Sequence, residues 1–444
     1  MEDNQEGEKL KNGLIYGLND KPPFKEAFFA ALQHLLAIFV AIITPPLIIA
    51  GALKLDAETT GYLVSMALFA SGISTFIQCR RFGGLGTGLL CIQGTSFSFI
   101  GPIIAAGTMG GLPLIFGSCI AASTVEMFIS RILKYTKRII TPLISGIVVT
   151  LIGMSLIKVG ITACGGGAAA QADGSFGSLR HVGLAALVLL LIIAFNRSSN
   201  RYMRMSSIVI GLVIGYIVAW FMGIVDFTSI QSYGGFNLPM PFRYGLDFSI
   251  STIIALGLIF MITAIEAYGD ITANSLISGE PVEGETFVKR ASGGILADGF
   301  NSMLAGMLNS FPNSVFAQNN RMIQLTGVAS RYVGYYIAGF LVILGLFPAV
   351  GLVFSLMPEP VLGGATLLMF GTVAAAGIRI IAAQEINRKA TLVMAISFSL
   401  GLSVELVPEI LCQLPETLRN IFSSGITTGG VTAILANALI HIKE

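Results

Sequence analysis

The sequence predicts an all-α polytopic membrane protein, and three observations carry the prediction. Of its 444 residues, 54% are hydrophobic and only 11% are charged, whereas a soluble globular protein carries about 25% charged residues. The mean hydropathy is +0.81, so too few polar side chains are present to cover a soluble surface. The apolar residues also gather in runs long enough to cross a bilayer, which takes about 20 residues per helix.

The composition also excludes several classes of protein. A net charge of only +2 and the lack of a Lys/Arg-rich tract argue against nucleic-acid binding. The five cysteines are scattered without CxxC or metal-ligand spacing, so we expect neither a disulfide framework nor a metal site. No nucleophile–base set is apparent, and we therefore expect no enzyme activity and no cofactor.

Apolar runs bounded by charges or Gly/Pro clusters give fourteen candidate spans. They lie near 27–51, 60–78, 84–106, 112–130, 139–158, 182–195 and 205–223 in the first half, and near 250–277, 292–310, 312–328, 331–354, 360–382, 390–406 and 424–441 in the second. The segment 407–422 is expected at the membrane interface, because charged residues interrupt it. Twelve spans is the alternative, since one run is short and two are irregular.

The basic residues favour fourteen spans. Loops that follow even-numbered spans hold most of the 26 Lys and Arg residues, and loops that follow odd-numbered spans hold only Lys54, Lys158, Arg180, Arg243 and Arg419. Basic residues concentrate in cytoplasmic loops. Both termini are therefore predicted to be cytoplasmic, with residues 1–26 forming a polar N-terminal tail.

Seven spans per half predict an inverted repeat, because an odd number of spans gives the two halves opposite orientations. The first repeat would cover 27–223 and the second 250–441, joined by an extracellular linker over 224–249. Each half has one irregular, polar segment, around Ser96 and around Gln318, at nearly the same place. We expect spans 3 and 10 to be broken there by short extended segments, and broken spans in matching positions point to a transporter's binding site.

Ionisable residues inside the predicted spans are few, and each is costly in a membrane. Glu266 and Asp270 stand four positions apart, so one helical face would carry both carboxylates. Asp298 and His34 interrupt two further spans. For each of the four a structural role remains the alternative: Asp270, for example, would cap backbone amides with help from Thr272.

Several motifs resemble those of the nucleobase–ascorbate transporter family. The run 318–327, QNNRMIQLTG, is similar to the family signature Gln-Asn-x-Gly-x-x-x-x-Thr, and Gln33-His34, Glu266 with Asp270, and Asp298 fall where the family has its other motifs. The similarity extends from about residue 22 to residue 439. Within the family the chain resembles the bacterial xanthine permeases.

The resemblance implies a core domain of spans 1–4 and 8–11, a gate domain of spans 5–7 and 12–14, and a homodimer formed through the gate domain. It implies that Glu266 and Gln318 are the main substrate ligands and that Phe97 stacks on the base. The positions beside them are Ser96, Ala317 and Asn319, and the coupling and support positions are Asp298, Asp270, His34, Thr272 and Arg321.

The chemistry of these side chains agrees with that expectation. An ionised Glu only accepts hydrogen bonds and suits the N–H edge of an oxidised purine, whereas a Gln amide both donates and accepts. An aromatic face binds the flat ring without choosing among bases. A buried carboxyl such as Glu266 or Asp298 can also take up a proton on one side of the membrane and release it on the other.

Two residues depart from the family pattern. Arg321 stands where the family usually has Gly; a cation there would either block close helix packing or pair with Asp298 or Asp270. Ser96 stands where the similar xanthine permeases tend to carry Asn. The smaller side chain leaves room beside the ring, so we expect tolerance of an 8-oxo group and hence of uric acid.

The sequence therefore predicts a proton-coupled symporter that imports xanthine and uric acid by alternating access across a bacterial inner membrane. Within the same class, a uracil or guanine symporter is the alternative, and sodium is the alternative coupling ion. From another class, an anion transporter is disfavoured because Glu266 would repel anions. A passive channel is disfavoured because it would use a repeated polar pore face.

Overall fold

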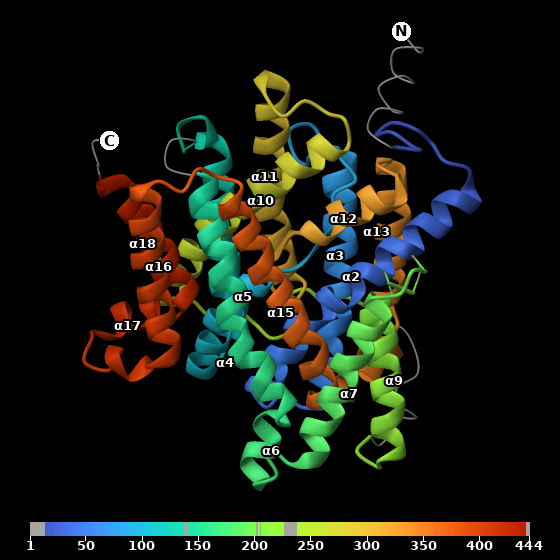
Figure 1. Ribbon diagram of the computed structural model, residues 1–444, viewed down its shortest axis with the longest axis vertical. Coiled ribbons are helices and arrows are strands. Elements are labelled where there is room, and N and C mark those ends of the chain that lie inside the picture. The colour runs from blue at the N-terminus through green and yellow to red at the C-terminus, as the bar shows by residue number, and fades with distance from the viewer. Residues whose placement is uncertain (1–13, 137–140, 201–202, 205, 226–237, 441–444) are drawn as a thin grey trace.

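A computed structural model describes residues 14–136, 141–200, 203–204, 206–225 and 238–440. Most of these residues are helical, and the helices run roughly side by side through the molecule (Figure 1). Residues 1–13 of the predicted tail and 226–237 of the predicted linker lie outside the described residues. The predicted all-α class is confirmed, because the described strands are only three residues long.

The helices of the first half follow the predicted apolar runs closely. They are α2 (Phe24–Ala52), α3 (Ala57–Arg80), α4 (Ile100–Thr136), α5 (Pro142–Cys164), α6 (Gly167–Asp173), α7 (Leu179–Asn196) and α9 (Ser207–Phe221). The strand β1 (Gln93–Thr95) and the 3₁₀ turn η1 (Phe97–Phe99) precede α4. The end of the third predicted run and the whole fourth run lie within α4, which is kinked at Gly110 and Gly111, where Gly111 has φ +67°.

The helices of the second half also follow the predicted apolar runs closely. They are α10 (Ile250–Ile277), α11 (Gly284–Met307), α12 (Ala317–Thr326), α13 (Arg331–Leu346), α14 (Pro348–Ser355), α15 (Glu359–Ala382), α16 (Arg388–Leu406), α17 (Glu416–Phe422) and α18 (Gly425–Leu439). The strand β2 (Asn313–Val315) precedes α12. The segment predicted at the membrane interface holds the 3₁₀ turn η3 (Pro408–Leu411) and α17, and both are too short to span a bilayer.

Eight helices among the described residues are long and apolar enough to cross a membrane, and up to nine if α13 and α14, which meet at 77°, form one bent span. The chain is therefore a multi-pass membrane protein. The fourteen-span inverted repeat, its division at residues 223 and 250, and the orientation of the termini stay predictions.

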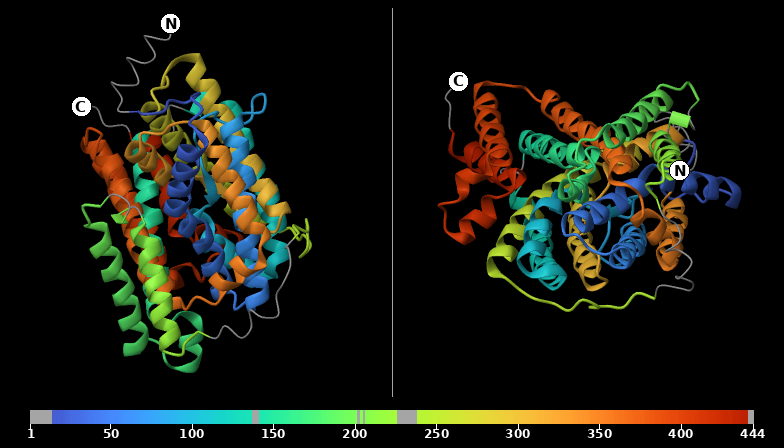
Figure 2. Two further views of the ribbon diagram at one scale, coloured as in Figure 1. Left: turned by 90° about the vertical axis from the view of Figure 1, so that its right-hand side faces the viewer. Right: turned by 90° about the horizontal axis from the view of Figure 1, so that it is seen from below.

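Helix packing separates two groups of elements. In one group α11 and α10 pack on α4, and α13 packs on α3; in the other α15 packs on α5 and α7, and α16 packs on α18 (Figures 1 and 2). The closest approaches lie at small residues: Gly153 of α5 faces Ala374 of α15, and Gly377 faces Thr150. Small residues let membrane helices come close enough for van der Waals contact.

Packing of α15 on α5 gives the first prediction. A Cβ atom at Gly377 would come under 3.0 Å from the backbone of α5, whereas one at Gly371, on the same helix, would meet nothing within 4 Å. We expect Gly377→Val to destabilise the purified protein by about 1–3 kcal/mol through overpacking, and Gly371→Val to leave its melting temperature unchanged. Thermal melting in detergent measures this, and equal melting temperatures would contradict the described packing.

Candidate functional site

Two short strands hold the centre of the site. β1 pairs antiparallel with β2, with Gly94 opposite Ser314. Two further backbone bonds extend the pairing, from Ser96 N to the Pro312 carbonyl at 2.9 Å and from Phe316 N to the Ile92 carbonyl at 3.0 Å. The segments 93–95 and 313–315 are thus extended, and the pairing satisfies backbone groups that would otherwise be unpaired in an apolar interior. Gln318 itself lies in α12, and a break of spans 3 and 10 at these segments stays a prediction.

Each strand leads directly into a helix that begins at the site. Ser96 caps η1 by accepting a hydrogen bond from Ser98 N at 3.4 Å, and α4 follows η1. Phe316 precedes α12. The first amide N–H groups of a helix have no partner within the helix and carry partial positive charge. Both strand–helix junctions therefore present hydrogen-bond donors to the same region.

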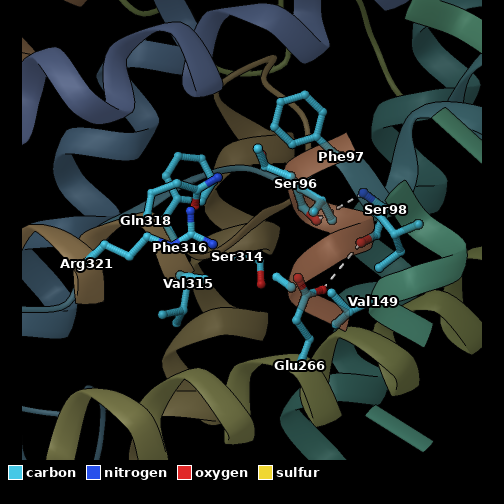
Figure 3. A pocket seen from close by; sticks show the side chains of 15 residues that line it. Ser96, Phe97, Ser98, Val149, Glu266, Ser314, Val315, Phe316, Gln318 and Arg321 are labelled. Atoms are coloured by element: carbon cyan, nitrogen blue, oxygen red, sulfur yellow. Dashed lines mark hydrogen bonds between the residues drawn. The ribbon is translucent and has the colours of Figure 1, made fainter. Parts of the chain in front are cut away.

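A pocket opens between these junctions, α10, α5 and α15 (Figure 3). Six of the residues predicted from the sequence line it: Ser96, Phe97, Glu266, Ala317, Gln318 and Arg321. Glu266 comes from α10 and the last three from α12. The lining also includes Ser98, Ser314, Val315 and Phe316 from the junctions, Val149 and Ile152 from α5, and Thr372, Val373 and Ala376 from α15. The pocket therefore lies between the two packing groups.

Polar and aromatic groups of the pocket come from different elements. Ser98 Oγ donates to Glu266 Oε2 at 3.5 Å, from η1 to α10. The Phe97 ring meets the Phe370 ring of α15 edge to face, with centroids 5.5 Å apart. In Figure 3 Glu266 rises from α10 toward Ser98, and the side chain of Arg321 extends from α12 on the other side of the pocket. The pocket thus holds four kinds of side chain: a carboxylate, an amide, a cation and an aromatic ring, from Glu266, Gln318, Arg321 and Phe97.

Asp298 is fully buried beside the pocket and does not line it. Its Oδ1 accepts a hydrogen bond from Gln93 Nε2, and its Oδ2 accepts one from Ser314 Oγ at 3.2 Å. Gln93 Oε1 in turn accepts from Asn301 Nδ2, whose other contact is the Ser74 carbonyl at 3.3 Å. The Asp298 carboxyl, on α11, is thereby hydrogen-bonded to residues of both strands.

His34 and Asn319 form a second buried pair away from the pocket lining. His34 Nδ1 donates to Asn319 Oδ1 at 3.0 Å, and Asn319 Nδ2 donates to the Leu90 carbonyl at 2.6 Å. Asn319 was predicted to lie at the substrate; in this conformation its side chain links α2 and α12 to the segment before β1. Its role at the substrate stays a prediction.

The remaining predicted residues lie on α10 outside the pocket lining. Asp270 is one turn beyond Glu266, and its backbone carbonyl accepts from Asn320 Nδ2 at 3.2 Å. Arg321 lies within electrostatic reach of Asp270, although among the described residues the two form no ion pair within 4.0 Å. Thr272 Oγ1 donates to the Tyr268 carbonyl at 2.7 Å within the helix.

Sequence reasoning missed several polar residues that the fold brings to the site. Gln93, Ser314 and Asn301 hold Asp298 in place. Glu126 of α4 is fully buried, and its carboxyl lies beside that of Asp298. A buried Glu in the middle of an apolar run was a signal that could have been found.

Comparison with known proteins now places the chain. Residues 25–410 match the model of a permease family, Xan_ur_permease. The chain belongs to this family. The permease is thus a membrane transport protein rather than an enzyme, and the resemblance to the nucleobase–ascorbate transporter family is confirmed.

Two relatives are similar over nearly their whole length. The permease is 50% identical to the xanthine permease XanP of Escherichia coli K12 over 436 residues, which cover 96% of this chain and 94% of XanP. It is 48% identical to the xanthine permease XanQ of the same strain, again over 436 residues, with 96% of this chain and 94% of XanQ covered.

A solved structure supports the fold alone. The murine Solute Carrier 26 family member A9 anion transporter, in its inward-facing state, superposes with a TM-score of 0.63 at 10% sequence identity. The superposition covers 95% of the permease and 69% of that chain.

The buried network around Asp298 gives the second prediction. Gln93→Leu leaves Asp298 Oδ1 and Asn301 Nδ2 without these partners, and an unmade buried hydrogen bond costs about 1–3 kcal/mol. We expect a lower melting temperature for this variant and an unchanged one for Gln384→Leu, whose side chain is exposed. Thermal melting of the two purified proteins measures the difference. A Gln93→Leu protein as stable as the parent would contradict the structural role of the network.

Proposed function

We propose that the permease is a proton-coupled symporter that imports xanthine, and also uric acid, by alternating access. The observation that carries the proposal is the pocket in which Glu266, Gln318 and Phe97 lie together between the two packing groups. The similarity to two proteins named xanthine permeases, at 50% and 48% identity, supports xanthine as the substrate.

The pocket's donors and acceptors match the edges of an oxidised purine. Glu266 would accept hydrogen bonds from ring N–H groups, and the Gln318 amide would pair with a neighbouring carbonyl and N–H. Phe97 would cover the ring face, held by its edge-to-face contact with Phe370. The amides at the start of η1 and α12 would face the purine oxygens.

Uric acid differs from xanthine by an oxygen at position 8. Ser96 lines the pocket next to Phe97, and its small side chain leaves space for that oxygen. This space supports uric acid as a second substrate.

Proton coupling is assigned to Asp298, supported by its burial and by its links to both strands. A proton on Asp298 removes a buried charge, and its loss strengthens the hydrogen bonds from Gln93 and Ser314. The two protonation states would therefore favour different arrangements of β1 and β2. Asp270 and His34 are included as supporting positions, because each is hydrogen-bonded to a side chain of α12. The Asp270 carbonyl accepts from Asn320, and His34 Nδ1 donates to Asn319.

The architecture included in this proposal is a fourteen-span, seven-plus-seven inverted repeat in a bacterial inner membrane, with both termini cytoplasmic. Antiparallel pairing of β1 and β2, which lie at matching places in the two halves, supports it. The group built on α5 and α15 would be the gate domain, and that domain would form a homodimer.

An anion transporter of the same fold is the second candidate. The structural similarity to an anion transporter and the Arg321 cation in the pocket lining favour it. Glu266 opposes it, because an ionised carboxylate in the same pocket repels an anion.

The third prediction tests the substrate ligand. Glu266→Gln replaces an acceptor-only carboxylate by an amide, and a hydrogen bond to a charged group is worth about 1.5–3 kcal/mol. We expect xanthine binding to weaken by at least about tenfold, measured with radiolabelled xanthine on the purified protein. Unlabelled uric acid should compete with xanthine on the parent protein.

The control is Glu385→Gln, at an exposed carboxylate outside the pocket lining, which should bind xanthine normally. Normal xanthine affinity in Glu266→Gln would refute the ligand role, and competition by chloride or sulfate instead of purines would favour the anion transporter.

The fourth prediction concerns coupling. Asp298→Asn keeps the shape of the side chain, but the Asn amide cannot bind and release a proton as a carboxyl does. We expect uphill accumulation of xanthine in cells to be lost, while exchange of labelled for unlabelled xanthine continues and the protein remains in the membrane. If the variant still accumulates xanthine fully, and a protonophore abolishes this accumulation, then Asp298 is not the coupling residue.

A further inference from the structure

A second pocket lies at the end of the molecule where α2 and α13 begin and α3 ends. Lys21, Pro22, Ala27, Tyr332, Tyr335 and Tyr336 line this tyrosine pocket, whose volume is about 340 Å³. These residues come from α2, the segment before it and α13, and none of them lines the pocket of Glu266. The proposed transport mechanism does not use it.

Backbone pairing positions the cation of this pocket. Tyr16 forms a bridge with Val328, and the amides of Ala329 and Arg331 donate to the carbonyls of Tyr16 at 2.9 Å and Leu18 at 3.1 Å. The segment before α2 is therefore held along the loop that enters α13. This fixes Lys21, whose Nζ lies 5.2 Å from the centre of the Tyr332 ring.

The pocket is basic. Arg331 approaches the same Tyr332 ring at 5.7 Å, and its buried Nε has no hydrogen-bond partner among the described residues. Asp20 and Glu26 are acidic residues of the same segment: Gly17 N donates to Asp20 Oδ2 at 2.8 Å, Ser330 Oγ donates to the Asp20 carbonyl at 2.6 Å, and the Tyr16 hydroxyl donates to Glu26 Oε2 at 2.5 Å. One cation, Lys21, therefore lines the pocket, and a second, Arg331, lies against the ring of its Tyr332.

An aromatic surface continues from the pocket along the outside of the helices. Phe24 contacts Tyr336 with ring centroids 6.0 Å apart, and Phe28 contacts Phe340 at 5.3 Å. The Phe24 and Phe29 side chains are 68% and 57% exposed, which in a membrane protein marks a face turned to lipid. The cations thus lie at the end of a lipid-facing aromatic wall.

We propose that the tyrosine pocket binds an anionic phospholipid, with the phosphate at Lys21 beside the Tyr332 ring and an acyl chain along Phe24, Phe28 and Phe340. The charge of the pocket matches a phosphate, and basic pockets between membrane helices are known as headgroup sites. The tyrosine hydroxyls can donate further hydrogen bonds to the headgroup. Lipid bound here would clamp the segment before α2 against α13.

Native mass spectrometry of the full-length protein tests this, with phosphatidylglycerol as the probe. We expect one tightly retained phosphatidylglycerol per chain and about fivefold weaker retention in Lys21→Gln, the effect of one basic residue at an anionic headgroup. Lys21→Arg should restore retention. Lys21 is exposed, so the variant is expected to fold, and its melting temperature without lipid should equal that of the parent.

The matched control is Arg180→Gln, an exposed cation at the start of α7, which should retain the lipid normally. Equal retention by Lys21→Gln and the parent would overturn the proposal, as would equal retention of zwitterionic phosphatidylcholine. Displacement of the lipid by inorganic phosphate at equal concentration would also overturn it, since the site would then bind free phosphate rather than a lipid.

Discussion

Pairing between β1 and β2 is the interaction on which the site depends. Two extended segments in an apolar interior would leave backbone N–H and C=O groups unpaired, which costs several kcal/mol for each group in a membrane. Because the strands pair with each other, Gly94 opposite Ser314, those groups are satisfied. The same pairing starts η1 and α12 side by side and so brings Ser96, Phe97 and Gln318 to one pocket.

The buried charges depend on the same strands. Asp298 receives hydrogen bonds from Gln93 of β1 and Ser314 of β2, so a change in its protonation acts directly on the strand pair. Glu266 lines the pocket instead, and it lies on α10, which follows neither strand. Substrate recognition and the proposed proton site are therefore adjacent but held by different elements, which lets each be altered by mutation while the other stays in place.

Much of this could be predicted from the sequence, for identifiable reasons. Apolar runs predict the helices, and the polar interruptions around residues 96 and 318 predict the extended segments, because such residues disfavour a lipid-facing helix. Partners of Asp298 could not be predicted, since Gln93 is 205 positions away in the sequence and only tertiary folding brings the two together. Asn319 shows the same limit: its motif position gave no sign that its side chain contacts His34, 285 positions away in the sequence.

A structure of the permease with xanthine bound tests the central claim most directly. The account predicts density for the base between Glu266 and Gln318, with its ring against Phe97, in the pocket bounded by α10, α12 and the two strands. Xanthine bound elsewhere, with Glu266 and Gln318 making no contact to it, would contradict the account.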